Sequence, residues 1–346
     1  MKDRKAVARL GSRSPVRLAD LALLVRAPAA LSVPGDVIAG AAAAGRPLGA
    51  RTLGVIGSSV CLYWAGMALN DYADAAVDAV ERPDRPVPSG RVPRRTALAV
   101  AGGLTAAGLG LAAAAGGRRG VGAALPLAGL VWAYDLKLKS TPAGAVAMAG
   151  ARALDVLAGA VASGPRDVSV GGAVRRAAVP AALVGVHTGT LMALSRHEVG
   201  GAPERVPATT LAVSAATAVA TAVPARRVAV ETDATGRRAS AAPSWLLARL
   251  PAPLRGVAAA APSRRLRAAV TAAGALAYLG TYGAAQVRAL REPSGENVRR
   301  AVGAGILGLM PLQAALTARS GAPGVAAALG VVHPLARRLA RRISPT

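Results

Sequence analysis

Five carboxylates lie within fourteen residues, 71–84, of a chain that is otherwise rich in alanine, valine, leucine and glycine. Asp71, Asp74 and Asp78 are spaced at i, i+3 and i+7, so on a helix their side chains would leave from one face. Such carboxylates repel one another unless a cation lies among them, and hard oxygen ligands suit Mg²⁺. The spacing predicts a Mg²⁺ site at these three residues, with a solvated acidic helix end as the alternative.

A stiff, basic loop follows the acidic stretch. It contains three prolines and Gly90, which favour turns, and it carries Arg82, Arg85 and Arg91. Guanidinium groups make paired hydrogen bonds with phosphate oxygens, and phosphate oxygens also bind Mg²⁺. Metal ligands beside anion-binding arginines therefore suit a diphosphate.

The composition is that of a polytopic membrane protein. Of the 346 residues, 53% are hydrophobic, and apolar runs of roughly 17 to 25 residues recur along the chain, long enough to cross a bilayer as helices. Alanine and glycine within these runs allow close helix packing in lipid, so we expect one all-α bundle. The expected spans are 28–46, 52–70, 96–116, 120–134, 142–163, 177–194, 207–224, 266–287 and 300–318, with a shorter tenth at 321–336.

The net charge of +25 is spread over the loops and does not line one face, which argues against nucleic-acid binding. Residues 1–27 form a basic lead-in with seven Lys or Arg residues up to Arg26, so we expect a cytoplasmic N-terminus in the plasma membrane. Arg26 itself is expected to anchor to headgroups, with reaching into a cavity as the alternative. Residues 28–336 would then be the membrane domain, with a polar Arg-rich loop at 225–265 and a basic tail at 337–346.

Two further loops are expected on the same side as the acidic stretch. The fourth span closes on Tyr134 and Lys137, and Lys137 either reaches a bound anion or is ordinary cytoplasmic charge. The sixth span ends at Arg196 and Glu198, and the Glu198 carboxylate could face the aspartates across a cavity.

Within the spans, the polar residues are expected to serve packing. Arg152 and Asp155 are three residues apart and should pair on one helix face. His187 is expected to be a hydrogen-bonded packing residue, and Tyr278 and Tyr282 should share a packed face.

The run from Asn70 to Arg91, NDYADAAVDAVERPDRPVPSGR, resembles the first aspartate-rich motif of the UbiA superfamily of intramembrane prenyltransferases. That motif reads N-D-x-x-D-x-x-x-D followed by an Arg-Pro-x-x-x-Gly stretch, and the wording is closest to the archaeal lipid-forming and chlorophyll-synthase-like branches. The resemblance implies nine helices around a cavity open to lipid, whereas the apolar runs of this chain leave nine or ten open. It also implies Mg²⁺-dependent transfer of a prenyl group from a prenyl diphosphate to an aromatic or other lipophilic acceptor.

The resemblance also implies roles for particular residues. Asp71, Asp74 and Asp78 would bind Mg²⁺ and act in catalysis with Glu198, and the Tyr134–Lys137 loop is similar to a Tyr-x-x-Lys element that contacts the diphosphate. The residues that would bind the diphosphate are Asn70, Arg82, Arg85, Tyr134, Lys137 and Arg196. The aromatic residues that could shield an allylic cation are Tyr63, Trp64, Tyr72, Trp132 and Tyr134.

The chain departs from the family pattern in the second acidic motif. Residues 195–199 read Ser-Arg-His-Glu-Val, similar to an actinobacterial-type subgroup, and keep only Glu198 as a carboxylate. His197 or Glu198 could take the acceptor's proton. The alternative is a degenerate protein that binds or helps to move an isoprenoid diphosphate. An ion-coupled transporter built on Arg152 and Asp155 would need matching interrupted helices in two halves, which the sequence does not display.

Overall fold

The computed structural model describes residues 16–46, 48–164, 169–223 and 263–330. Most of the predicted polar loop and the whole predicted basic tail lie outside these residues. The labelled elements of the described chain are α2 (Leu18–Leu24), η1 (Ala27–Ser32), α3 (Val33–Ala43), α4 (Ala50–Ala73), α5 (Ala75–Glu81), α6 (Arg94–Gly116), α7 (Arg118–Ala133), η2 (Tyr134–Leu138), α8 (Ala143–Ala162), α9 (Val170–Ser195), α10 (Arg205–Ala222), α13 (Arg264–Tyr278), η3 (Leu279–Gly283), α14 (Ala284–Arg291) and α15 (Gly295–Arg319).

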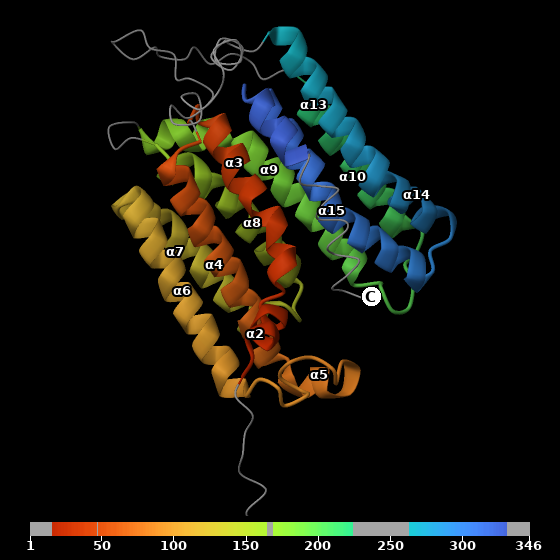
Figure 1. The fold of residues 1–346 in the computed structure, drawn as a ribbon. Coiled ribbons are helices and arrows are strands. Elements are labelled where there is room, and N and C mark those ends of the chain that lie inside the picture. The colour runs from red at the N-terminus through yellow and green to blue at the C-terminus, as the bar shows by residue number, and fades with distance from the viewer. Residues whose placement is uncertain (1–15, 47, 165–168, 224–262, 331–346) are drawn as a thin grey trace, which may run out of the picture.

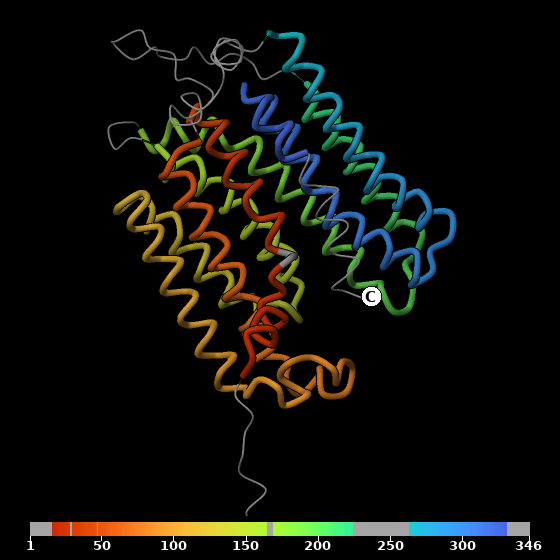
Figure 2. The backbone as a smooth tube through the Cα atoms, in the orientation of Figure 1, coloured from red at the N-terminus to blue at the C-terminus, as the bar shows by residue number. Residues whose placement is uncertain are grey.

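The described elements form a helical bundle, as the composition predicts (Figure 1). Within the described residues, six helices are long and apolar enough to cross a membrane: α4, α6, α7 continued by η2, α8, α9 and α15. The α10 helix and the run α13–η3–α14 pack beside α9 and α15, and Figure 2 shows the chain passing back and forth between the two ends. The all-α, multi-pass fold is confirmed, whereas the total of nine or ten spans remains a prediction.

The first predicted span, 28–46, is an interrupted helix. A short helix, α2, ends before Arg26, and the chain then continues through the 3₁₀ turn η1 into α3. Pro28 and Pro34 stand in the first turns of η1 and α3, where proline's fixed φ suits a helix start. The two prolines therefore frame this span, as the sequence predicts.

Helices α3 and α8 meet backbone to backbone because glycine faces each partner. A Cβ atom on Gly40 would lie 1.8 Å from the carbonyl oxygen of Val156, and one on Gly159 would lie 2.2 Å from that of Val37. Both distances are shorter than any real contact, so only glycine fits. Small residues thus set the helix spacing, as expected where lipid removes the hydrophobic drive between helices.

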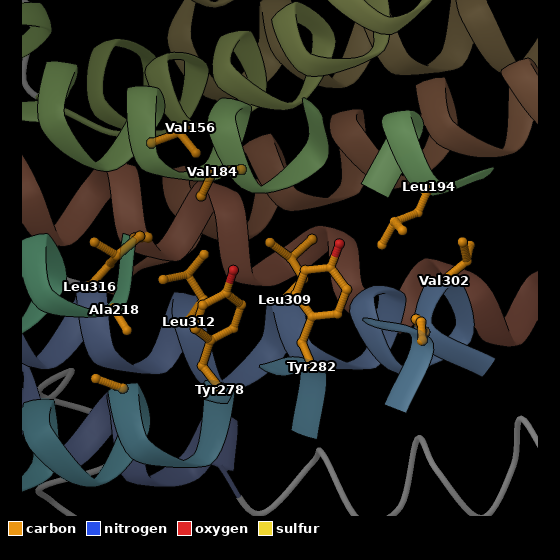
Figure 3. Packing of buried hydrophobic residues seen from close by; sticks show 14 of the residues in the cluster. Val156, Val184, Leu194, Ala218, Tyr278, Tyr282, Val302, Leu309, Leu312 and Leu316 are labelled. Carbon is orange, nitrogen blue, oxygen red and sulfur yellow. The ribbon is translucent and has the colours of Figure 1, made fainter. Parts of the chain in front are cut away.

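The largest buried cluster lies between α9, α10, α13 and α15. Figure 3 shows Tyr278 and Tyr282 directed into this cluster among leucine and valine side chains, and both tyrosines are fully buried. His187 bonds to the Tyr278 hydroxyl through Nδ1 and to the Gly305 carbonyl through Nε2, each at 3.1 Å. The predicted packing roles of His187, Tyr278 and Tyr282 are confirmed.

The Gly159→Ala substitution should destabilise the bundle, because its Cβ would press against the α3 backbone. We expect a loss of about 1–3 kcal/mol, the usual cost of overpacking. Thermal unfolding in detergent micelles would measure it. The matched control is Gly103→Ala on α6, where no heavy atom lies within 4 Å of the added Cβ. Equal melting temperatures for the two variants would contradict the prediction.

Candidate functional site at one end of the bundle

The acidic stretch lies at the end of α4 and continues into α5, which lies across this end of the bundle (Figure 1). The chain is helical on both sides of Asp74 but not through it, because Asp74 has φ −89° and ψ 5°. The predicted single stripe of three aspartates is therefore interrupted at its middle member. Asp71 and Asp78 are each 2% exposed, whereas the Asp74 side chain is 27% exposed.

Asp71 and Asp78 share one cation. The Arg85 Nη1 atom lies 2.6 Å from an Asp78 oxygen and 3.6 Å from an Asp71 oxygen, and Arg82 lies 3.8 Å from Asp78. Buried carboxylates need such partners because their desolvation is otherwise very costly. Arg82 and Arg85 thus lie beside the aspartates, as the sequence predicts.

Arg26 contributes a second cation to Asp71. Its Nη2 atom lies 3.1 Å from Asp71 and 3.4 Å from the Asn70 side-chain oxygen, and its Nη1 atom lies 3.5 Å from the sulfur of Met67. The expected headgroup anchor is therefore wrong, because the guanidinium turns inward to the site. Arg26 also has φ 46° and ψ 52°, the only positive φ among the described non-glycine residues. Such left-handed backbone is unfavourable for a side chain as large as arginine.

The loop after α7 supplies the partner of Asp74. The chain forms a π-helical turn, η2, and Lys139 just beyond it makes a close ion pair with Asp74. Asn70 donates to Asp74 at 3.1 Å and to the buried Asp135 at 3.4 Å. Lys137 is exposed and makes no ion pair with any described residue, so the lysine that reaches the acidic segment is Lys139.

The loop after α9 reaches the same end of the bundle. Arg196 donates to the Thr141 carbonyl at 3.3 Å, and Arg299 at the start of α15 donates to the Glu198 carbonyl at 3.2 Å. Burial raises the pKa of the Glu198 carboxyl above its usual 4.5, while the charges of Arg299 and Arg82 oppose that rise. The carboxylate predicted to face the first motif therefore lies within electrostatic reach of Arg82.

The donor set at this end suits Mg²⁺, because all its anionic groups are carboxylates and Asp71 and Asp78 already share one cationic group. Asp74 is turned toward Lys139 instead. Within the described part of the chain, no three His, Cys, Asp or Glu side chains are grouped closely enough to hold a metal. Phosphate or water oxygens would have to complete the coordination of an ion bound here.

Two of the aromatic residues predicted to shield a cation are used for packing. Trp132 donates its indole N–H to Thr105 on α6 at 3.0 Å. Tyr72 lies beneath the guanidinium of Arg94, whose Cζ is 4.4 Å from the ring centre. These contacts hold α6 against α4 and α7. By contrast, Tyr63 lies within electrostatic reach of both Arg26 and Arg152.

The predicted Arg152–Asp155 pair does not form. Arg152 reaches across to Asp36 on α3, with an Nη2–Oδ2 distance of 2.7 Å, while Ser59 on α4 hydrogen-bonds Asp155. Residues three apart can interact along a helix, but partners on neighbouring helices compete for the same groups. The local spacing therefore gave the wrong partner for both residues.

Arg26, Asp135 and Lys139 were not predicted as site residues. Asp135 directly follows Tyr134, and Lys139 is one of only four lysines, so both carried a signal in the sequence. Spacing could not choose Lys139 over Lys137, because the π-helical turn widens the helix by one residue. For Arg26, the sequence contains no sign of the left-handed backbone that aims it.

Comparisons with known proteins agree with this picture. The chain is 44% identical over 110 residues to a digeranylgeranylglyceryl phosphate synthase of Methanopyrus kandleri, a match that covers 32% of this chain and 38% of that relative. The match thus spans under half of the relative's length.

Two solved structures share the fold, each with a TM-score of 0.56. One, described as a study of digeranylgeranylglyceryl phosphate synthase in membranes, is 15% identical and aligns over 89% of this chain and 99% of its own. The other, a UbiA homolog from Aeropyrum pernix K1, is 18% identical and aligns over 88% and 97%. The model of the UbiA prenyltransferase family matches residues 33–224, more than half of the chain. This protein therefore belongs to the UbiA prenyltransferase family.

Proposed function

We propose that the protein is a Mg²⁺-dependent membrane prenyltransferase that moves a prenyl group from a prenyl diphosphate to a lipophilic acceptor. The observation that carries the proposal is the convergence of carboxylates and cations at one end of an apolar bundle. Asp71 and Asp78 meet Arg26 and Arg85 there, and Asp74 meets Lys139. Membership of the family supports the same reaction class.

The donor has two chemically different ends, and the bundle offers a matching surface to each. Its diphosphate suits the charged end of the bundle, and its hydrocarbon chain suits the apolar helices. Mg²⁺ is usually held by one or two carboxylates together with substrate phosphates, and it would neutralise charge on the diphosphate. Asp71 and Asp78 are the residues we propose as its ligands, with Asp74 and Asn70 beside them.

The cations would bind and stabilise the departing diphosphate. The Arg85 and Lys139 side chains are 21% and 22% exposed, so each can turn part of its donor set toward phosphate oxygens. Negative charge grows on the diphosphate as its bond to the prenyl carbon breaks, and positioned cations stabilise that charge. Arg82, Arg196 and Tyr134 would contribute from the rim of the site, whereas the exposed Lys137 is not assigned a contact with the diphosphate.

The acceptor must lose a proton as it takes the prenyl group. We propose that Glu198, on the loop after α9, accepts this proton. Burial raises the pKa of the Glu198 carboxyl, which makes the carboxylate a stronger base. The bond from the prenyl carbon to the diphosphate breaks, a bond to the acceptor forms, and the acceptor's proton passes to Glu198. Two compounds offered as acceptors would test the acceptor class. One is a prenylated glyceryl phosphate, which the names of the relatives suggest, and the other is an aromatic acid.

The second candidate function is binding of a prenyl diphosphate without transfer of its prenyl group. It is favoured by the loop at 195–199, where Glu198 is the single carboxylate and the nearby charges are arginines. Binding that requires Mg²⁺ but gives no product with any acceptor would favour this function. We propose that the site faces the cytoplasm, because the segment up to Arg26 carries seven Lys or Arg residues and its helix α2 lies at this end, where Asp20 pairs with Arg91.

Asp71→Asn and Asp78→Asn should each lower diphosphate release by about 10²–10³-fold, because each removes charge from the group that holds the metal. Release from geranyl, farnesyl and geranylgeranyl diphosphate by the purified protein would measure this, with and without a chelator of Mg²⁺. Asp84→Asn is the matched control, since Asp84 is exposed in the same segment. Turnover equal to that of the wild type in both site variants would remove the assignment.

Lys139→Ala should weaken donor binding about 10-fold or more, because a charge-assisted contact to phosphate would be lost. Lys137→Ala should have little effect, since Lys137 is exposed and has no ion-pair partner among the described residues. Titration with a thiolodiphosphate analogue of the donor would compare the two variants. A larger loss in Lys137→Ala would reverse our assignment of the lysine.

A further inference from the structure

The interruption of the first span leaves backbone groups that need partners. Between α2 and α3 the chain turns through a left-handed Arg26 and the 3₁₀ turn η1, so the regular ladder of helical hydrogen bonds is broken. Inside a membrane protein such freed groups must be satisfied by other protein atoms, because lipid offers none. The carbonyl of Ser32 lies at the junction of η1 and α3.

Side chains from two distant helices cap that junction. The Ser32 carbonyl accepts hydrogen bonds from Gln313 on α15 at 2.8 Å and from Arg152 on α8 at 3.3 Å. The same two side chains hold Asp36, one turn into α3, at 2.7 Å each. Asp36 is 0% exposed and Gln313 is 2% exposed, so the hydrogen bond between them is made away from solvent.

Gly35 and the Gln313 side chain are closely packed at this junction. A Cβ atom on Gly35 would lie 2.0 Å from the Gln313 side-chain oxygen, so glycine is what allows Gln313 to reach Ser32 and Asp36. Asp36 carries a buried charge whose cationic partner is Arg152. Moving the junction would therefore separate a buried ion pair and break the hydrogen bonds from Gln313 and Arg152 to the Ser32 carbonyl.

The helix before the interruption, α2, is also held by an ion pair. Asp20 on α2 pairs at 3.0 Å with Arg91, which lies at the end of the basic loop after α5. Arg26 thus stands between two anchored segments, one before it and one after it. Strained backbone persists only where the surrounding structure holds it, and these anchors meet that requirement for φ 46°.

We propose that Asp36, Arg152 and Gln313 are positioning residues that fix the break in the first span and so keep the Arg26 guanidinium on Asp71. Within the described chain, none of the three makes a hydrogen bond or ion pair with residues 70–78, so in this proposal they act through the η1 backbone that leads to Arg26. The consequence for donor affinity rests on the proposed function, whereas the placement of Arg26 does not.

The first experiment measures the placement of Arg26 without any donor. Phenylglyoxal labelling of the purified protein, followed by peptide mass spectrometry, reports how accessible the Arg26 guanidinium is. We expect Arg152→Leu and Gln313→Met to raise the labelling rate several-fold, with Arg152→Lys restoring it partly. Arg175→Leu is the control, because Arg175 is exposed on α9. Unchanged Arg26 labelling in folded Arg152→Leu and Gln313→Met would overturn the proposal.

The second experiment is a double-mutant cycle on donor binding. Affinity for geranyl thiolodiphosphate with Mg²⁺ is measured for the wild type, Arg26→Ala, Arg152→Leu and the double variant. We expect each single variant to bind about 10-fold more weakly and the double variant to bind no more weakly than Arg26→Ala, since neighbours that act as a unit are non-additive. Additive losses, or a lowered melting temperature with unchanged affinity, would contradict positioning.

The two experiments separate the possible failures. If the wild type binds no prenyl diphosphate, the proposed function fails, and the labelling result alone decides the positioning role. If Arg152→Leu does not fold, Gln313→Met carries both measurements, because it removes the Gln313 hydrogen bonds to Ser32 and Asp36 and leaves the Asp36–Arg152 ion pair in place.

Discussion

Asp71 and Asp78 share the guanidinium of Arg85 at the end of an apolar bundle, and the rest of the site depends on that interaction. Two carboxylates that are almost fully buried cannot remain charged without cations close by. Their partners come from the broken first span and the basic loop, and the loop after α7 supplies the partner of Asp74. Segments far apart in the sequence therefore meet at one end of the bundle, where ion pairs hold them together. In the proposed function, the diphosphate and its metal would rearrange these ion pairs.

The interior of the bundle serves this end of the molecule through close packing and a few polar contacts. Glycine allows α3 and α8 to touch at Gly40 and Gly159, and this proximity brings Asp36 within reach of Arg152. Small residues supply contact area where lipid supplies no hydrophobic drive, and buried polar groups give the contact a fixed register. The separate tyrosine and histidine cluster stabilises the other side of the bundle in the same way.

Some parts of the site could be predicted because they are local. The acidic stretch, its arginines and the loop at Glu198 were found from residue type and from the alternation of spans, which places every second loop at one end. Other parts could not be predicted because they depend on competition between helices. Arg152 pairs with Asp36 in place of Asp155, and Trp132 donates to Thr105 on α6.

The sequence by itself determined the fold class, the membrane character and the residue types of the candidate site, because hydrophobic run length and carboxylate spacing are properties of the chain alone. Only the tertiary structure decided which groups meet. It breaks the aspartate stripe at Asp74, selects Lys139 in place of Lys137, and bends the backbone at Arg26 so that a residue expected at the lipid headgroups contacts Asp71. The physical reason is that a buried charge takes the nearest partner in space, and nearness in space is set by the packing of the helices.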